Sequence, residues 1–149
     1  TVARGYRLRP ELTEAAFASG MHRTSDRGRI DQHNRLVVVG RVDDVVQVGG
    51  INVSVAAVEG AVQEHPMVAE AAVVAVADDQ WGSKITAFVV ANGLESVSDQ
   101  QLIASIVERA ANALGAESRP RDIVLMDSLP TLPTGKIDRE QLRSLAAQS

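Results

Sequence analysis

The spacing of apolar residues predicts two amphipathic helices, each of which begins at a polar residue. Valines recur on one helical face after Ser54, a suitable N-cap, and this helix is expected to end before Pro66. Leucine, isoleucine and valine recur at helical spacing after Ser98, and Gln101 completes a capping box with that serine. Gly115 is expected to end the second helix. Both helices should therefore pack one apolar face on a core.

Near-continuous apolar runs at 68–78, 85–91 and 122–126 predict three strands, and the first two are expected to be buried on both faces. Shorter apolar runs at 36–39 and 45–48 each end at glycine and predict two more strands. We expect these two short strands to pair as a small hairpin around the sequence "RVDD" between them.

Further helices are expected near both ends of the chain. Asp138 is a suitable cap for a terminal helix that turns Leu142 and Leu145 inward. Near the start, "PELTEAAFASG" predicts a helix closed by Gly20. The first ~40 residues have few apolar anchors and should make a poor independent core. The prediction is an α+β fold: a small three-stranded sheet with flanking helices, preceded by a short two-stranded hairpin.

Composition narrows the possible functions. The chain has 149 residues, of which 45% are hydrophobic and 23% charged, as in an ordinary folded domain. Its net charge of −4 argues against binding of nucleic acid or an anionic membrane by the whole chain, and its apolar runs are too short to span a bilayer. It has no cysteine, and its 3 histidines lie far apart, so no metal site is expected. The first residue is threonine, so we expect a fragment of a longer protein.

Lys136 follows a glycine in "PTGKIDR", which at first resembles a phosphate-binding loop. Such a loop needs a glycine five residues before the Gly-Lys pair and a Ser or Thr after it. Pro130 and Ile137 occupy those two positions, so that interpretation fails. Taken alone, Lys136 would be a solvated lysine on a turn.

Three stretches in order change this interpretation: "HRTSD" at 22–26, "GRVDDVVQVGG" at 40–50 and "PTGKIDR" at 133–139. They resemble the T-G-D, G-R-x-D and closing G-K motifs of the acyl-adenylate enzymes. This superfamily includes AMP-forming acyl- and aryl-CoA ligases, adenylation domains and luciferases. The run-in "ARGYRLRPELTEAAFASGM" is also similar to the family, so the resemblance covers nearly the whole chain.

The resemblance implies a domain organisation and a reaction. Residues 1–42 would be the tail end of a large N-terminal domain, and residues 43–149 the small C-terminal lid domain. The whole protein would be a cytoplasmic ligase that joins a carboxylic acid to ATP as an acyl-adenylate and then transfers the acyl group to CoA. ATP would be bound mainly by the large domain, through a Ser/Thr/Gly-rich loop that this chain does not contain, and Mg²⁺ would accompany ATP there, bound through the phosphates. The isolated chain is therefore expected to be inactive.

The resemblance also assigns roles in the first half-reaction. Asp26 would accept hydrogen bonds from the ribose hydroxyls of ATP, because a carboxylate can hold both hydroxyls of a diol. Arg41 would contact the same nucleotide through its planar fork, with a surface ion pair to Asp43 or Asp44 as the alternative. Lys136 would be the catalytic residue, offsetting the negative charge that accumulates when the substrate carboxylate attacks the α-phosphate.

A second orientation of the lid would serve thioester formation. Gly49 and Gly50 would then lie beside the pantetheine arm of CoA, although a double glycine is also a common turn. Asp43 would be the hinge whose backbone dihedrals absorb the rotation between the two orientations.

The subfamily is less sharply defined by the sequence. Ser25, Gln47 and Ala57 replace a glycine, a lysine and a glutamate that are common in the family. The sequence stretches "VGGINV" and "VAAVE" are most similar to those of o-succinylbenzoate–CoA ligases of menaquinone synthesis. Fatty-acyl, aryl and amino-acid substrates stay open, as do a carrier protein in place of CoA and a homo-oligomeric state. A non-catalytic α+β binding module would explain the core, but not three motifs in family order.

Overall fold

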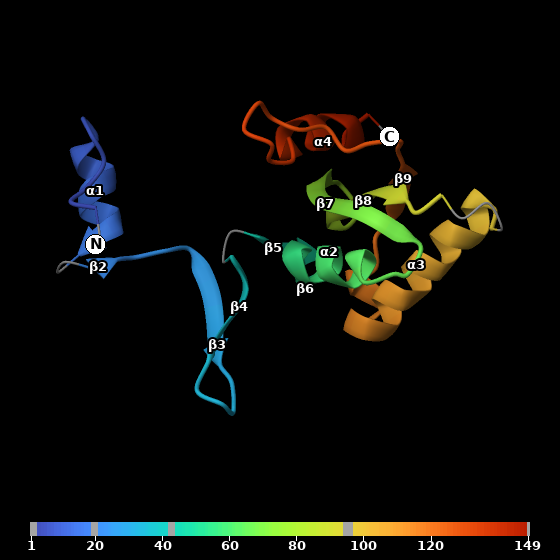
Figure 1. The fold of residues 1–149 in the computed structure, drawn as a ribbon, viewed down its shortest axis with the longest axis horizontal. Helices are drawn as coiled ribbons and strands as arrows, with labels where there is room; N and C mark the ends of the chain where they lie inside the picture. Colours follow the sequence, from blue (N-terminus) through green and yellow to red (C-terminus); the bar gives the residue numbers. More distant parts are fainter. Residues whose placement is uncertain (1–2, 19–20, 42–43, 94–96, 149) are drawn as a thin grey trace. The chain divides into compact units, whose positions relative to one another are not determined.

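The computed structural model describes residues 3–18, 21–41, 44–93 and 97–148. The chain divides into two compact units, Thr1–Val42 and Asp43–Ser149. The elements of both units are drawn in Figure 1.

The second unit is built on a three-stranded sheet. β7 (Val68–Asp78) and β8 (Gly82–Ala91) form a long antiparallel hairpin, and β9 (Asp122–Leu125) pairs with β8 in parallel. β8 is therefore the central strand, and β7 lies at one edge. The three strands predicted from the apolar runs are confirmed, and so is the α+β class.

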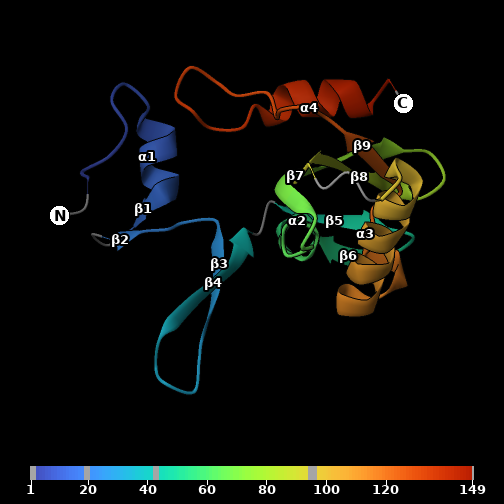
Figure 2. The ribbon, with the colours of Figure 1, turned by 45° about the vertical axis from the view of Figure 1, so that its right-hand side comes forward.

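Both faces of this sheet are covered, because alternate residues of a strand point to opposite faces. Val73 belongs to a core that β7 and β8 share with α2 (Val55–Gln63) and α3 (Asp99–Leu114), whereas Val74 belongs to a second core under α4 (Arg139–Ala146). Figure 2 shows α4 on one side of the sheet and α2 and α3 on the other. A 3₁₀ turn, η2 (Ala116–Ser118), follows α3.

The helix ends are fixed by the caps expected from the sequence. The Ser54 hydroxyl accepts the backbone N–H of Ala57 at 3.2 Å, and Ser98 and Gln101 form a capping box at the start of α3. Gly115 ends α3 with a φ of +99°, a conformation that glycine adopts without strain.

One detail of the terminal helix was predicted wrongly. Leu142 is fully buried, as expected, but Leu145 is 38% exposed, and Ala146 takes the inward position instead. Residues four apart stack on one face of a helix, so a register that places Leu142 inward also favours Ala146.

The hairpin predicted around "RVDD" is also wrong. The strand β4 (Leu36–Arg41) pairs with β3 (Asp26–Ile30), and β5 (Val45–Val48) pairs with β6 (Ile51–Ser54) through the turn at Gly49 and Gly50. A two-residue turn in which both residues have positive φ joins antiparallel strands closely, which explains why β5 pairs forward along the chain.

The first unit contains α1 (Pro10–Ala16), β1 (Phe17–Ala18), β2 (Met21–His22) and the β3–β4 hairpin. Of its residues with a described burial, none is buried, which agrees with the expectation of a poor independent core. The helix ends at Ala16, and Gly20, its predicted end, lies outside the described residues. In the described parts of both units, no helix has the length and hydropathy needed to cross a membrane.

Candidate functional site

Lys136 stands at the end of a three-residue hairpin loop. The backbone N–H of Leu132 donates to the carbonyl of Lys136 at 2.7 Å, and the N–H of Gly135 donates to the carbonyl of Leu132 at 2.9 Å. Gly135 has a φ of +79°. This is the pattern of a type I turn followed by a left-handed residue, and Pro133 occupies the turn position that proline favours. The sequence "LPTGK" thus specifies a tight turn that ends at Lys136.

The base of this Lys136 turn is tied to the fold. Thr131 and Ile137 form a β-bridge, and the N–H of Asp138 donates to the carbonyl of Pro130 at 2.8 Å. Asp138 also caps α4 by accepting a backbone N–H from its first turn, as predicted. Ile137 is half-buried against the core under α4. Lys136 itself is exposed, so its ammonium can reach a group outside this unit.

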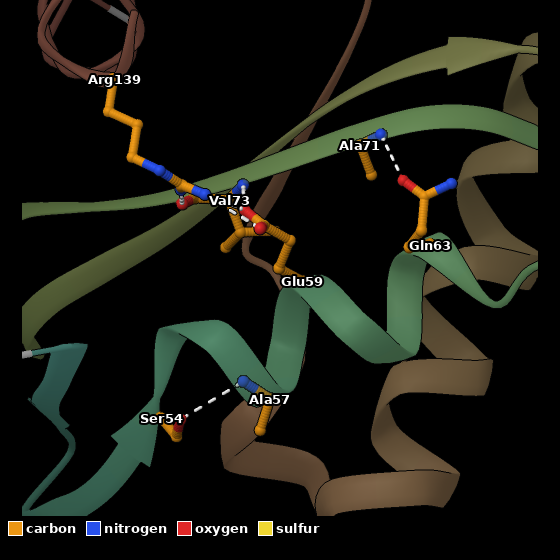
Figure 3. Close-up of polar contacts among 7 residues, drawn as sticks. All are labelled: Ser54, Ala57, Glu59, Gln63, Ala71, Val73 and Arg139. Atoms are coloured by element: carbon orange, nitrogen blue, oxygen red, sulfur yellow. Dashed lines mark hydrogen bonds and ion pairs between the residues drawn. The ribbon is translucent and has the colours of Figure 1, made fainter. Parts of the chain in front are cut away.

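Arg139, the first residue of α4, connects the Lys136 turn to the edge of the sheet (Figure 3). Its Nη2 lies 2.9 Å from each carboxylate oxygen of Glu59, and its Nη1 donates to the carbonyl of Val73 at 2.9 Å. The N–H of Val73 donates to Glu59 Oε2 at 2.8 Å. The sequence did not reveal this contact, because Glu59 and Arg139 are 80 residues apart.

Gly49 and Gly50 form the two-residue turn of the β5–β6 hairpin, with φ values of +59° and +84°. The N–H of Gly49 donates to the carbonyl of Trp81 at 2.9 Å, and a Cβ on Gly49 would come within 3.1 Å of the Trp81 ring. The guanidinium of Arg121 lies over that ring, 4.0 Å from its centroid. A Cβ on Gly50 would meet nothing within 4 Å in the described chain. The turn is therefore braced at Gly49 and open at Gly50.

Asp26 and Arg41 are cross-strand partners in the β3–β4 hairpin, and their side chains approach within 3.9 Å. The sequence had not paired Arg41 with Asp26. Both residues line an open hollow of about 600 Å³ in the first unit, together with Thr24 and Ser25. The structure thus brings together Asp26 and Arg41, the two residues that the family resemblance assigns to nucleotide binding.

The other predicted site residues fall on different elements. The Gly49–Gly50 turn joins strands whose Val48 and Val53 pack with α2 and α3, whereas the Lys136 turn leads into α4 on the opposite face of the sheet. Asp43 lies outside the described residues. Within the part of the chain that the structure describes, no three His, Asp or Glu side chains gather where they could hold a metal ion. These described residues therefore offer Mg²⁺ no ligand set.

His65 is a buried polar residue between α2 and α3, and only 8% of it is exposed. Its Nδ1 accepts the N–H of Met67 at 3.2 Å, and its Nε2 lies 3.1 Å from the hydroxyl of Ser105. That hydroxyl donates to the carbonyl of Leu102, so Nε2 carries the proton of a neutral ring. Burial lowers the pKa of His65 below 6.5, and the positive charge of Arg109 lowers it further. We therefore assign His65 a structural role.

Comparison with known proteins places this arrangement in a family. Residues 57–136 match the family described as the AMP-binding enzyme C-terminal domain. That match includes most of α2, the whole three-stranded sheet and Lys136, and it covers more than half of the chain. The chain therefore belongs to this family, and the resemblance to the C-terminal domain of acyl-adenylate enzymes is confirmed.

Individual relatives agree with this assignment. The chain is 39% identical over 127 residues to an acetyl-coenzyme A synthetase of Streptomyces avermitilis, covering 85% of this chain and 20% of that protein. It is 34% identical over 140 residues to a 4-chlorobenzoate–CoA ligase of Arthrobacter sp., covering 93% of this chain and 26% of that protein. The anthranilate CoA ligase AuaEII, solved with anthranoyl-AMP, superposes with a TM-score of 0.81 at 34% identity, covering 100% of this chain and 29% of that one. The chain thus spans only about a fifth to a third of the length of these relatives.

Proposed function

We propose that this chain is the C-terminal part of an AMP-forming acid–CoA ligase. Residues 43–149 act as its mobile lid, and residues 1–42 belong to the end of its large N-terminal domain. The observation that carries the proposal is the Lys136 turn: the lysine of the family's closing motif is exposed at the end of a hydrogen-bonded loop. Such a residue can enter an active site on another domain and leave it again.

In the first half-reaction, a carboxylate oxygen attacks the α-phosphorus of ATP, and the bond to the bridging oxygen breaks to release pyrophosphate. Two anions meet in this step, so negative charge accumulates between the acid and the α-phosphate. The ammonium of Lys136 offsets that charge where it develops. Removing one such donor typically lowers the rate by about 10²–10³-fold. A lysine suits this task because its flexible stem carries a compact charge.

Asp26 and Arg41 contribute to nucleotide binding. Asp26 accepts hydrogen bonds from the ribose hydroxyls, and Arg41 donates to ribose or phosphate oxygens. Their separation of 3.9 Å in an open hollow supports this pairing. In the free protein each side chain offsets the charge of the other.

The second half-reaction uses the other face of the lid. The sulfur of CoA attacks the acyl carbonyl, AMP leaves, and the thiol proton passes to solvent. Gly50 leaves room for the pantetheine arm, a role supported by the open space around the position of its missing Cβ. Because the Gly49–Gly50 turn and the Lys136 turn belong to opposite faces of the sheet, rotation about Asp43 would exchange one for the other.

For the acid substrate we propose o-succinylbenzoate, and with it a cytoplasmic role in menaquinone synthesis. This rests on the "VGGINV" and "VAAVE" wording of the sequence. The relatives named above activate acetate and 4-chlorobenzoate, or hold anthranoyl-AMP, so the fold of this domain serves several acids. The second candidate is an adenylation domain that loads a carrier protein, since only the thiol acceptor differs.

ATP–pyrophosphate exchange on the full-length protein tests the proposal. The acids to compare are o-succinylbenzoate, acetate, 4-chlorobenzoate and a long-chain fatty acid, with a reaction lacking acid as the control. We expect exchange with one class of acid, and thioester formation when CoA is added. Exchange without a CoA thioester would favour a carrier-protein acceptor. If none of the acids supports exchange and ATP does not bind, a non-catalytic binding module becomes the better account.

A further inference from the structure

A group of polar contacts outside the predicted site joins three elements of the second unit. β7 is an edge strand, so the N–H and C=O groups along its free side need partners. Helix α2 supplies these partners from two side chains one turn apart. The side-chain amide of Gln63 donates from Nε2 to the carbonyl of Ala69 at 3.0 Å, and its Oε1 accepts the N–H of Ala71 at 2.8 Å. The carboxylate of Glu59 accepts a hydrogen bond from the N–H of Val73, as Figure 3 shows.

The two side chains of α2 differ in one respect. Among the described residues, the side-chain hydrogen bonds of Gln63 go to the strand, whereas Glu59 also accepts hydrogen bonds from Arg139 at the start of α4. The side chain of Glu59 is 25% exposed, and the side chain of Arg139 is 41% exposed. Two bonds from one guanidinium nitrogen and a third from the other to Val73 hold Arg139 in a single direction. A fork of this kind is more restrictive than the surface pair of Arg143 and Glu140, whose atoms are 3.9 Å apart.

Arg139 lies three residues after Lys136 in the chain, and backbone hydrogen bonds hold the short segment between them. The carbonyl of Pro130 accepts a hydrogen bond from the N–H of Asp138, and the carbonyl of Ile137 accepts one from the N–H of Arg139 at 3.2 Å. A displacement of Arg139 therefore moves the base of the Lys136 turn. The contact with Glu59 and Val73 fixes that base relative to the sheet.

We propose that Glu59 and Arg139 are positioning residues for adenylation, because their ion pair on the edge of β7 sets where the Lys136 turn stands. This inference rests on the proposed function. Neither residue needs to touch a substrate. Without the pair, α4 stays docked through Leu142 and Ala146, but the Lys136 turn samples a wider range of positions. Misplacement of a catalytic group by ~1 Å can slow a reaction by about 10²-fold.

The test uses full-length Glu59→Gln and Arg139→Lys proteins, with Gln63→Ala as the matched control on the same helix and strand edge. Adenylate formation is measured in single turnover, and thioester formation is measured separately from supplied acyl-adenylate. We expect both pair variants to slow adenylate formation by about 10–100-fold while thioester formation changes little. The double variant should be no slower than the worse single variant, because both changes break one contact. Gln63→Ala should leave both half-reactions intact.

Hydrogen exchange supplies a readout that does not depend on activity. The N–H groups of Leu132, Gly135 and Asp138 should exchange faster in Glu59→Gln and Arg139→Lys than in Gln63→Ala. Unchanged exchange, or an equal loss in both half-reactions, would overturn the positioning role. So would faster exchange without slower adenylation. A Lys136→Ala protein with normal adenylation would instead refute the proposed function itself, so the two failures are distinguishable. Arg139→Lys keeps the charge and the stem, so it serves if Glu59→Gln does not fold.

Discussion

The packing of α4 gives a quantitative prediction, because its two leucines have very different surroundings. Leu142 is fully buried in the core under α4, whereas Leu145 is 38% exposed and borders an open hollow. Leucine-to-alanine substitution removes about three carbon groups, or ~2.4 kcal/mol of transfer free energy at ~0.8 kcal/mol each. At Leu142 a closed cavity adds to this, so we expect a loss of about 3–4 kcal/mol. At Leu145 the covered fraction limits the loss to about 1.5 kcal/mol.

The assay is urea unfolding of Leu142→Ala and Leu145→Ala, followed by tryptophan fluorescence. The only tryptophan of the chain is Trp81, which lies in the second unit, so the signal reports on the unit that carries α4. We expect the free energy of unfolding to differ by about 2 kcal/mol between the two variants. Equal losses, or a larger loss at Leu145, would show that α4 is rotated so that Leu142 is not the leucine that faces the core.

Three further predictions concern the same unit. His65 has a lowered pKa when folded, so the unfolded chain takes up its proton first, and stability should fall as the pH drops below about 6.5; urea midpoints should fall less with pH in His65→Gln. Gly135→Ala should lower the free energy of unfolding by ~1–2 kcal/mol, since φ is positive although the space is open, and Gly135→Asn should cost less in the same urea titration. The Thr86 hydroxyl is buried and has no hydrogen-bond partner among the described residues. Thr86→Val should therefore raise the free energy of unfolding by about 1 kcal/mol in a thermal melt. A lower free energy of unfolding would show that the hydroxyl has a partner.

Much of the second unit could be predicted from the sequence because its signals are local. Ser54, Ser98 and Asp138 each precede an apolar helical pattern, and each caps a helix in the structure. The apolar runs at 68–78 and 85–91 are long enough to be buried on both faces, and they form the two long strands.

The errors arose where the local signal was weak or ambiguous. β3 is a charged strand with a glycine at its centre, so its sequence "DRGRI" gives no apolar alternation, and its partner β4 was paired with the wrong strand. The double glycine at 49–50 follows an apolar run and so indicates the end of a strand, but two consecutive residues with positive φ form a tight hairpin turn. Near the C-terminal end, the larger apolar side chain of Leu145 favours an inward position, but helix geometry places Ala146 there.

The candidate site divides in the same way. Lys136 was found from a motif, and its turn follows from Pro133 and Gly135. The contact of Glu59 with Arg139 could not be found from sequence, because it depends on where α2 and α4 meet the edge of β7. Such a contact is set by tertiary packing, and no pattern of neighbouring residues records it.

The central claim is that Lys136 supplies positive charge to adenylate formation and has no direct part in thioester formation. The most direct measurement is the rate of each half-reaction in full-length Lys136→Ala, with supplied acyl-adenylate for the second. We predict that adenylate formation falls by about 10²–10³-fold, while thioester formation stays close to that of the unsubstituted protein. Equal losses in both half-reactions, or no loss in adenylate formation, would contradict the account.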